Sequence, residues 1–194
     1  MPNSPTRHTE FNRVTVFTGS RHGNDAAYLE AIKAFARTLA DRQLGVVFGG
    51  GSVGLMGVLA DTALDAGAEV HGVMPETMLE AEIPHQHLTQ LDIVPDMHTR
   101  KQRMAQLGDA FVALPGGIGT LEEFFEIWTW QQLGLHTKPV ALLNSAGFWD
   151  PLIAMIDHMA THGFVRQSFT EALIINDQPE ALLDALASWE PPAR

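Results

Sequence analysis

The stretch AFVALPGGIGTLEE, residues 110–123, decides the fold because it reads as a strand, a turn and a helix start. Residues 110–114 are apolar throughout, as expected for a central parallel strand that is buried on both faces. Residues 115–119 supply a proline and glycines for the turn, and residues 120–133 carry apolar side chains at helical spacing. A strand followed at once by a helix is the repeating unit of an α/β sheet.

The same unit recurs on both sides of this stretch. Short β-branched runs predict strands at 13–18, 44–48, 69–74, 91–94, 110–114, 140–143 and 173–175. Amphipathic segments predict helices at 26–42, 55–66, 98–107, 120–133, 148–162 and 179–188. Residues 75–90 are polar and contain prolines, so we expect a long loop over the strand ends. The alternation predicts the α/β class, with a Rossmann-like doubly wound parallel sheet and helices on both faces.

Length and composition predict one domain over residues 13–190, preceded by a disordered leader over residues 1–12. The chain has no cysteine, which excludes disulfides and thiol nucleophiles and favours a reducing cytosol. Its net charge of −11 argues against a nucleic-acid partner. No apolar stretch is long enough to cross a membrane, and the N-terminus lacks the apolar segment of a secretory signal. We therefore expect a soluble, cytoplasmic protein.

Two glycine-rich turns each lie between a predicted strand and a predicted helix. The first is Gly49-Gly50-Gly51-Ser52-Val53-Gly54, and the second is Pro115-Gly116-Gly117-Ile118-Gly119-Thr120. Glycines there let backbone N–H groups approach an anion, and the helix N-terminus adds the positive end of its dipole. Any tight connection favours glycine, but two such loops at one sheet edge predict a phosphate-binding site.

A dinucleotide site is an alternative. Gly49, Gly51 and Gly54 satisfy the pattern G-x-G-x-x-G, and Glu76 lies where a ribose-binding acid is expected. Against this interpretation, the loop follows the second predicted strand rather than the first. The second glycine-rich loop would also have no role.

Arg100, Lys101 and Arg103 form the densest basic cluster of an acidic chain. Charge runs on helices usually face solvent, so a solvated helix face is one interpretation. The other is a set of donors for a phosphate or for a developing negative charge.

Glu122, Glu123 and Glu126 follow the second glycine-rich loop. Thr120 and Glu123 fit a capping box, in which each side chain bonds the other's backbone N–H group. A catalytic carboxylate beside a phosphate site is the other interpretation of Glu123. The spacing alone leaves both open, and the location beside the loop favours catalysis.

The histidines predict no metal site. His85 and His87 could form a pair of ligands, but no third ligand stands at a diagnostic spacing, so we expect an exposed loop pair. No serine or threonine lies in a nucleophile elbow.

Three motifs together resemble one known family. They are GGGSVGLMG at 49–57, MHTRKQRM at 97–104 and PGGIGTLEE at 115–123. In this order, within a match from about Val14 to Leu186, they resemble the "lonely guy" (LOG) family of cytokinin riboside 5′-monophosphate phosphoribohydrolases. One departure is Ile118, where plant members commonly carry tyrosine, and it bears on the pocket wall.

The resemblance implies hydrolysis of N6-modified adenosine monophosphates, and often of AMP, to free base and ribose 5-phosphate. It implies a Rossmann-like fold, commonly a homodimer with active sites near the subunit interface, and catalytic roles for Arg100 and Glu123. Its ligand contacts map onto Glu82, Lys101, Gly117, Ile118, Gly119, Thr120, Leu121, Glu122 and Thr129. From their loops, Gly49, Gly50, Gly51 and Gly116 are added as substrate-binding candidates.

No metal or organic cofactor is expected. Relatives are often labelled lysine decarboxylases, but a pyridoxal-phosphate enzyme needs a Schiff-base lysine. None of Lys33, Lys101 and Lys138 has a convincing context for that role. Besides the hydrolase, two alternatives stay open: an NAD(P)-binding oxidoreductase and a nucleotide-binding carrier or sensor without catalysis. Arg100 could serve the leaving base or the phosphate, and the base substituent is not predicted.

Overall fold

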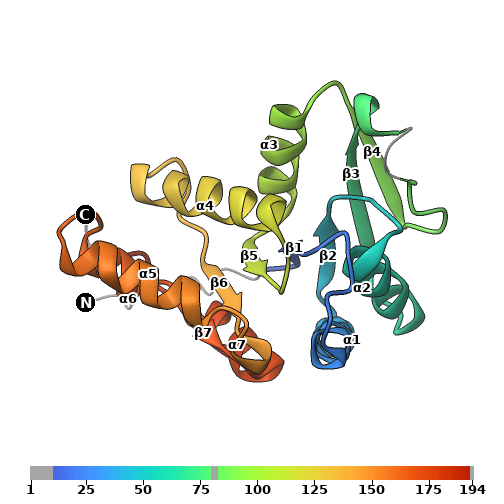
Figure 1. Ribbon diagram of the computed structural model, residues 1–194. Helices are drawn as coiled ribbons and strands as arrows, with labels where there is room; N and C mark the ends of the chain where they lie inside the picture. The colour runs from blue at the N-terminus through green and yellow to red at the C-terminus, as the bar shows by residue number, and fades with distance from the viewer. Residues whose placement is uncertain (1–10, 80–82, 193–194) are drawn as a thin grey trace, which may run out of the picture.

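The computed structural model describes residues 11–79 and 83–192. Residues 1–10 of the predicted leader and Glu82 lie outside the described residues. Seven parallel strands form one sheet in the order β4-β3-β2-β1-β5-β6-β7 (Figure 1). The strands are β1 Arg13–Phe17, β2 Gly45–Phe48, β3 Val70–Pro75, β4 Gln90–Val94, β5 Ala110–Ala113, β6 Val140–Leu143 and β7 Ile174–Asn176. The predicted α/β class and the parallel sheet are confirmed.

Helices cover both faces of the sheet. They are α1 Ala26–Asp41, α2 Gly54–Asp65, α3 Met97–Leu107, α4 Ile118–Leu133, α5 Asp150–Thr161, α6 Gln167–Glu171 and α7 Pro179–Ala187. Two short 3₁₀ helices, η1 Glu76–Met78 and η2 Ser145–Gly147, follow β3 and β6. In the view of Figure 1, α1, α2 and α7 lie below the sheet, and α3 and α4 lie above it.

The strands divide the core into two layers because successive side chains point to opposite faces. In β5, Ala110 and Val112 join the layer under α1, α2 and α7, whereas Phe111 and Ala113 join the layer with α3, α4 and α5. Every residue of β5 is buried, which explains why its sequence is apolar without alternation.

The structure corrects several predicted boundaries. The last long helix before β7 begins at Asp150 rather than at 148, because Pro151 sits in its first turn, where proline's missing N–H costs nothing. The predicted loop at 75–90 contains η1 and an antiparallel bridge between Gly51 and Pro84. Helix α6 was not predicted. No helix among the described residues is long and apolar enough to cross a membrane.

The strand order fixes where a ligand can bind. The chain runs from β1 outward through β2, β3 and β4, then returns to the other side of β1 with β5. At such a switch point the loops after the two central strands separate and leave a crevice at their carboxyl ends. The loop after β1 and the loop after β5 therefore frame the expected site.

Candidate active site

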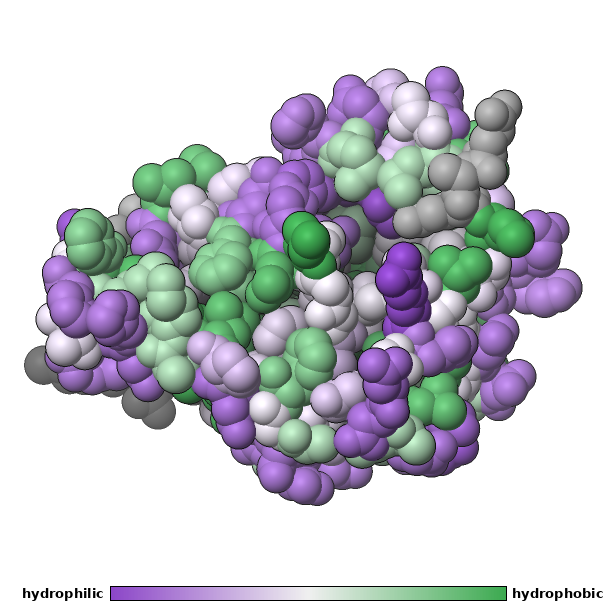
Figure 2. Space-filling view, viewed as in Figure 1, coloured by the Kyte–Doolittle hydropathy of each residue, from purple (hydrophilic) through white to green (hydrophobic). Residues whose placement is uncertain are grey.

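A cavity of about 620 Å³ opens at this switch point. Its volume lies within the range of small-molecule sites. Figure 2 shows a hollow on this face of the molecule, bordered by both hydrophilic and hydrophobic side chains. Its lining comes from the loop after β1, from α2, α3, the loop after β5 and the start of α4, and from Tyr28, Met78 and Phe148. Segments far apart in the sequence thus meet in one space.

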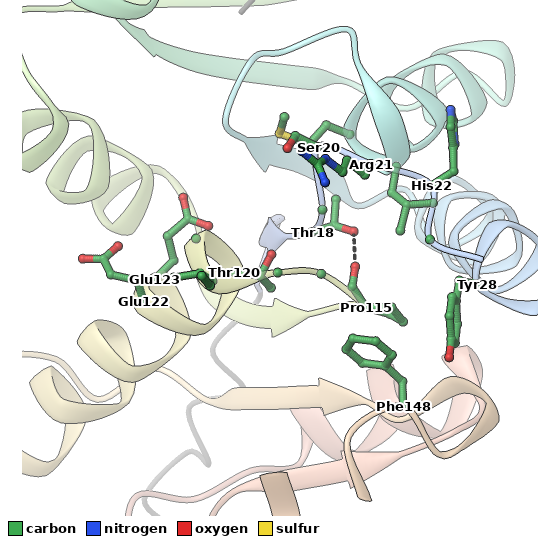
Figure 3. A pocket seen from close by; sticks show the side chains of 18 of the residues that line it. Thr18, Ser20, Arg21, His22, Tyr28, Pro115, Thr120, Glu122, Glu123 and Phe148 are labelled. Atoms are coloured by element: carbon green, nitrogen blue, oxygen red, sulfur yellow. Dashed lines mark hydrogen bonds between the residues drawn. The ribbon is translucent and has the colours of Figure 1, made fainter. Parts of the chain in front are cut away.

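The loop after β1 is held between two neighbours. Thr18 Oγ1 and Gly19 N both donate to Pro115 O, at 3.0 and 3.2 Å, and the first of these bonds is drawn in Figure 3. On the other side, Leu55 N and Met56 N at the start of α2 donate to Gly19 O at 3.0 and 3.3 Å. These bonds place Ser20, Arg21 and His22 at the cavity.

Helix α4 begins two residues earlier than predicted, at Ile118, with Gly117 as its N-cap. No side chain caps this end, so the capping box of Thr120 and Glu123 is wrong. The sequence pattern placed the helix start too late because glycine disfavours helix, yet Gly119 lies in the first turn of α4 and Gly117 is its N-cap. The first N–H groups of a helix have no intrahelical acceptor, and the residues of this first turn, Ile118, Gly119 and Thr120, line the cavity.

The glycines of the second loop differ in what they allow. A Cβ on Gly116 would lie 2.1 Å from Thr120 Oγ1 and 2.9 Å from Gly19 N, so this residue must be glycine for packing. A Cβ on Gly117 or Gly119 would meet nothing within 4 Å. These two glycines face open space in the cavity, and that space leaves the backbone accessible to a ligand.

The first glycine-rich loop is explained by packing. A Cβ on Gly54 would lie 2.2 Å from Ser20 C, and Gly50 has a φ of +82°. Gly49, Gly50 and Gly51 do not line the cavity. The N–H groups at the start of α2, where a dinucleotide pyrophosphate would bind, already donate to Gly19 O. The dinucleotide alternative therefore finds no support in this loop.

Arg100, on α3, lines the cavity although it is only 5% exposed. Its Nε donates to Val73 O at 3.0 Å, and its Nη2 donates to Gly49 O at 2.7 Å. The sulfurs of Met78 and Met97 both lie 3.7 Å from its Nη1. Two backbone carbonyls thus fix one edge of the guanidinium, and this orientation places the group at the cavity wall.

Lys101 points to a different neighbour. Its ammonium pairs with Glu122 and with Glu126 Oε2, the latter at 3.0 Å, and the residue is 7% exposed. Burial disfavours the charged ammonium, but hydrogen bonds and charge from the two glutamates outweigh it and raise the pKa of Lys101 above its ordinary value. Lys101 does not line the cavity, whereas Glu122 does.

The basic cluster is therefore not a solvated helix face, because Arg100 and Lys101 are buried. Arg103 leaves the site altogether and pairs with Asp92 Oδ2 through its Nε at 2.7 Å. Burial raises the pKa of Asp92, but hydrogen bonds from Arg103, Gln90 and His71 prevail and lower it to about 2. This pair ties α3 to β4 and supports the fold.

Glu122 and Glu123 lie on the first turns of α4, at the end of the cavity opposite Tyr28 and Phe148 (Figure 3). Ile118, Gly119 and Thr120 also line the cavity, and Ile118 is 88% exposed. Leu121 and the exposed Thr129 lie on α4 outside the lining. Within this chain the structure thus brings together the predicted residues Arg100, Gly116, Gly117, Ile118, Gly119, Thr120, Glu122 and Glu123.

The prediction of an exposed histidine pair is wrong for His85. This residue is 7% exposed, and its Nε2 lies 2.9 Å from Asp61 Oδ1. Its Nδ1 accepts a bond from His87 N, so both ring nitrogens serve to fix the loop. Among residues 11–79 and 83–192, no group of three potential ligands could hold a metal ion.

Several lining residues were missed from the sequence. They lie mainly after β1, at Thr18, Gly19, Ser20, Arg21 and His22, with Tyr28 and Phe148 beside them. Tyr28 and Phe148 meet edge to face at 5.2 Å between ring centroids. The available signal was the strand order, because a doubly wound sheet that starts in its centre places the loop after its first strand at the switch point.

Comparisons with known proteins identify the family. A family model described as "Possible lysine decarboxylase" matches residues 56–186. A cytokinin riboside 5′-monophosphate phosphoribohydrolase of Rhodococcoides fascians is 46% identical over 90% of this chain and 89% of its own. One of Arabidopsis thaliana is 41% identical over 94% of this chain and 86% of its own. The resemblance to the LOG family is confirmed.

Solved structures share the fold at lower identity. A molybdenum cofactor binding protein from Rippkaea orientalis has a TM-score of 0.69 and 18% identity, covering 93% of this chain and 98% of its own. A Moco carrier protein from Chlamydomonas reinhardtii has a TM-score of 0.66 and 17% identity, covering 90% of this chain and 94% of its own. At these identities the likeness shows the fold alone.

The positions of the lysines decide between the two descriptions of the family. A decarboxylase that uses pyridoxal phosphate needs a lysine in the cavity, and none of the three lysines lines it. Lys33 pairs with Glu30, Lys101 with Glu122 and Glu126, and Lys138 Nζ donates to two backbone carbonyls. The motifs, the cavity and the relatives agree instead that this chain belongs to the LOG family, the cytokinin riboside 5′-monophosphate phosphoribohydrolases.

Proposed function

We propose that this protein hydrolyses the N-glycosidic bond of N6-modified adenosine 5′-monophosphates, releasing the free base and ribose 5-phosphate. The observation that carries the proposal is the meeting of the uncapped start of α4, Arg100 and Glu123 at one cavity. An anion site, a fixed cation and a carboxylate are the groups that this reaction uses. The names of the relatives support the same activity.

The phosphate binds at the start of α4 in this proposal. The N–H groups of the helix start and the positive end of its dipole favour an anion, and the bare faces of Gly117 and Gly119 let it approach. Arg21 lines the same cavity and adds positive charge. Holding the phosphate orients the sugar, and this orientation converts binding energy into rate.

Glu123 acts on the sugar. Cleavage of the bond passes through an oxocarbenium-like state with positive charge on the ribose, and a nearby carboxylate stabilises that charge. The same carboxylate can orient the attacking water. The helix begins at Ile118, so Glu123 does not stand at the capping position that its spacing from Thr120 suggested.

Arg100 supplies a positive charge with a fixed orientation. It can stabilise the negative charge that develops on the departing base, or it can contact the phosphate. Its neighbours Met78 and Met97 favour the base, because polarisable thioethers pack well against aromatic rings. We therefore assign Arg100 to the leaving base.

The assembly proposed is a homodimer in a reducing cytoplasm, acting on AMP as well. Hydrophobic side chains gather over α4 and α5 in Figure 2, and a monomer would leave them in water. Apart from Ile118 at the cavity, the most exposed are Leu133 of α4 and Leu135 just after it, both at 68%, Met155 of α5 at 54% and Phe164 just after α5 at 85%. A second copy covering this face would also bring the exposed Thr129 of α4 into an interface.

One experiment tests the function. Purified protein is incubated with N6-isopentenyl AMP, AMP and adenosine, and the products are separated by chromatography. The proposal expects free base and ribose 5-phosphate from the nucleotides and little turnover of adenosine. Nucleotide binding without any product would identify a carrier instead. Binding of NAD(P) with hydride transfer would identify an oxidoreductase.

A further inference from the structure

A partly buried ion cluster joins α3 to α4 beside the cavity. It consists of Lys101, Glu122 and Glu126, hereafter the Lys101 cluster. The ammonium of Lys101 contacts both carboxylates, and Glu126 Oε2 lies 3.0 Å from it. The side chains of Lys101 and Glu126 are only 8% and 24% exposed. The side chain of Glu122 is 51% exposed. Taking the charges of Lys101 and Glu126 out of water costs free energy, so the contacts that keep them together are strong constraints on geometry.

The cluster sits next to both residues that carry the proposed chemistry. Lys101 follows Arg100 on α3, and Glu122 precedes Glu123 on α4. Glu126 stands one helical turn beyond Glu122, so both carboxylates lie on the same face of α4 and contact the ammonium of Lys101 from there. The cluster therefore links the stretch of α3 that holds the cation to the stretch of α4 that holds the carboxylate.

Within this chain, Lys101 and Glu126 do not lie where they could contact a ligand in the cavity. Neither residue lines the cavity, and the ammonium is directed to α4. Glu122 is the one member that reaches the lining. An effect of Lys101 or Glu126 on the reaction must therefore pass through the placement of other groups.

We propose that Lys101 and Glu126 are positioning residues that fix the spacing between Arg100 and Glu123 by locking α4 against α3. This inference rests on the proposed function, because the spacing matters only if both residues act on one substrate. A misplacement of about 1 Å in an active site can cost on the order of a hundredfold in rate. The phosphate site at the start of α4 is built from backbone, so its affinity depends less on this lock.

The variants are Lys101→Met, Lys101→Arg and Glu126→Gln, with Arg103→Met as the matched control. Methionine keeps length and removes the charge, whereas arginine keeps the charge. Arg103 lies on the same helix and its pair with Asp92 points away from the cavity, so its loss tests whether any broken ion pair of α3 has the same effect. Should Lys101→Met fail to fold because it leaves two carboxylates unpaired, Glu126→Gln carries the test.

The measurement is kcat and KM for N6-isopentenyl AMP. We expect kcat to fall on the order of tenfold to a hundredfold in Lys101→Met and less in Glu126→Gln, with KM within about twofold of wild type. Lys101→Arg should recover most of the rate, and Arg103→Met should keep it. A large rise in KM with unchanged kcat would make Lys101 a ligand contact and overturn the inference. Unchanged kinetics in both Lys101→Met and Glu126→Gln would overturn it too.

A second readout does not depend on the reaction. Hydrogen exchange followed by mass spectrometry should show faster exchange in the first two turns of α4 in Lys101→Met and Glu126→Gln, but not in Arg103→Met. If wild-type protein releases no base from any nucleotide, the proposed function fails while this comparison still tests the lock. Equal exchange in wild type and in both cluster variants would show that the cluster does not hold α4.

Discussion

Gly49 and Arg100 fit each other so closely that any side chain at position 49 would displace the guanidinium. Nη2 of Arg100 lies 2.7 Å from Gly49 O, and a Cβ built on Gly49 would lie 2.1 Å from that same nitrogen. The first glycine-rich loop thus serves the site indirectly. It leaves room for the cation and gives that cation a carbonyl to bind.

Gly49→Ala should therefore resemble a loss of Arg100. We expect kcat to fall on the order of a hundredfold, because the guanidinium must leave its orientation to avoid the methyl group. Nucleotide affinity should change little, since the start of α4 is untouched. Steady-state kinetics with N6-isopentenyl AMP check the rate, and calorimetric titration of AMP checks the affinity. Near-normal kcat in a folded Gly49→Ala protein would contradict the fixed orientation of Arg100.

Substitutions at Gly117 or Gly119 of the second loop should lower nucleotide affinity and leave the fold intact. Gly117→Ala or Gly119→Val places a side chain in open space at the cavity, so AMP affinity should fall more than tenfold while circular dichroism and Tm stay close to wild type. Gly116→Ala is the contrast, because its Cβ meets Thr120 Oγ1 at 2.1 Å and should lower Tm. Normal AMP binding by a folded Gly117→Ala protein would assign the phosphate to another part of the cavity.

Glu123→Gln tests the catalytic carboxylate. Glutamine keeps the shape and loses the negative charge, so the rate should fall on the order of a hundredfold or more while AMP binding and Tm stay near wild type. Glu30→Gln on α1 is a suitable control, because this exposed carboxylate pairs with Lys33 away from the cavity. A Glu123→Gln enzyme that retains most of its hydrolysis would remove the assignment.

Asp92 predicts a pH dependence of stability rather than of activity. Its pKa in the folded protein is about 2, below the ordinary value of 3.8, so the ionised form contributes stability above pH 4 that is lost as the pH falls toward 2. The shift corresponds to about 2.5 kcal/mol at most, since each pKa unit is about 1.4 kcal/mol. The free energy of unfolding of wild type and Asp92→Asn, measured by urea denaturation, should converge between pH 4 and pH 2. A constant difference over that window would refute the prediction.

Light scattering tests the assembly. The exposed apolar side chains on α4 and α5 and in the segments just after them predict a symmetric dimer at micromolar concentration. Phe164→Glu, which charges the most exposed phenylalanine among them, should shift the mass toward the monomer. A monomeric mass of the wild-type protein would contradict the predicted dimer.

Much of the fold could be predicted because it depends on local patterns. The apolar run at 110–114, bounded by a proline and glycines, predicts a strand buried on both faces, and it is β5, next to the central β1. The helix boundaries that were predicted wrongly depend on the backbone conformation of one or two residues. The pattern of Thr120 and Glu123 matched a capping box, yet the chain turns helical at Ile118, which side-chain identities do not reveal.

The site could be predicted only in part. Arg100, Glu123 and the loop at 116–120 were found because they lie in dense local motifs. The pairing of Lys101 with Glu122 and Glu126 was not found, because it joins two helices whose mutual orientation comes from the packed sheet. The loop after β1 carries two separated glycines among polar residues and no glycine-rich motif, so its place in the site followed only from the strand order.

The central position of β1 also has a consequence for how the chain is made. On one side β1 pairs with β2, which follows soon in the sequence, but on the other it pairs with β5, and the bond from Thr18 to Pro115 spans 97 positions. During synthesis one edge of the apolar strand β1 stays unpaired until β5, in the second half of the chain, has been made. Unpaired edges of this kind promote association with other chains, and such distant pairing makes folding slow. The nascent first half, rather than the completed chain, is therefore the species that we expect to associate most readily with other chains.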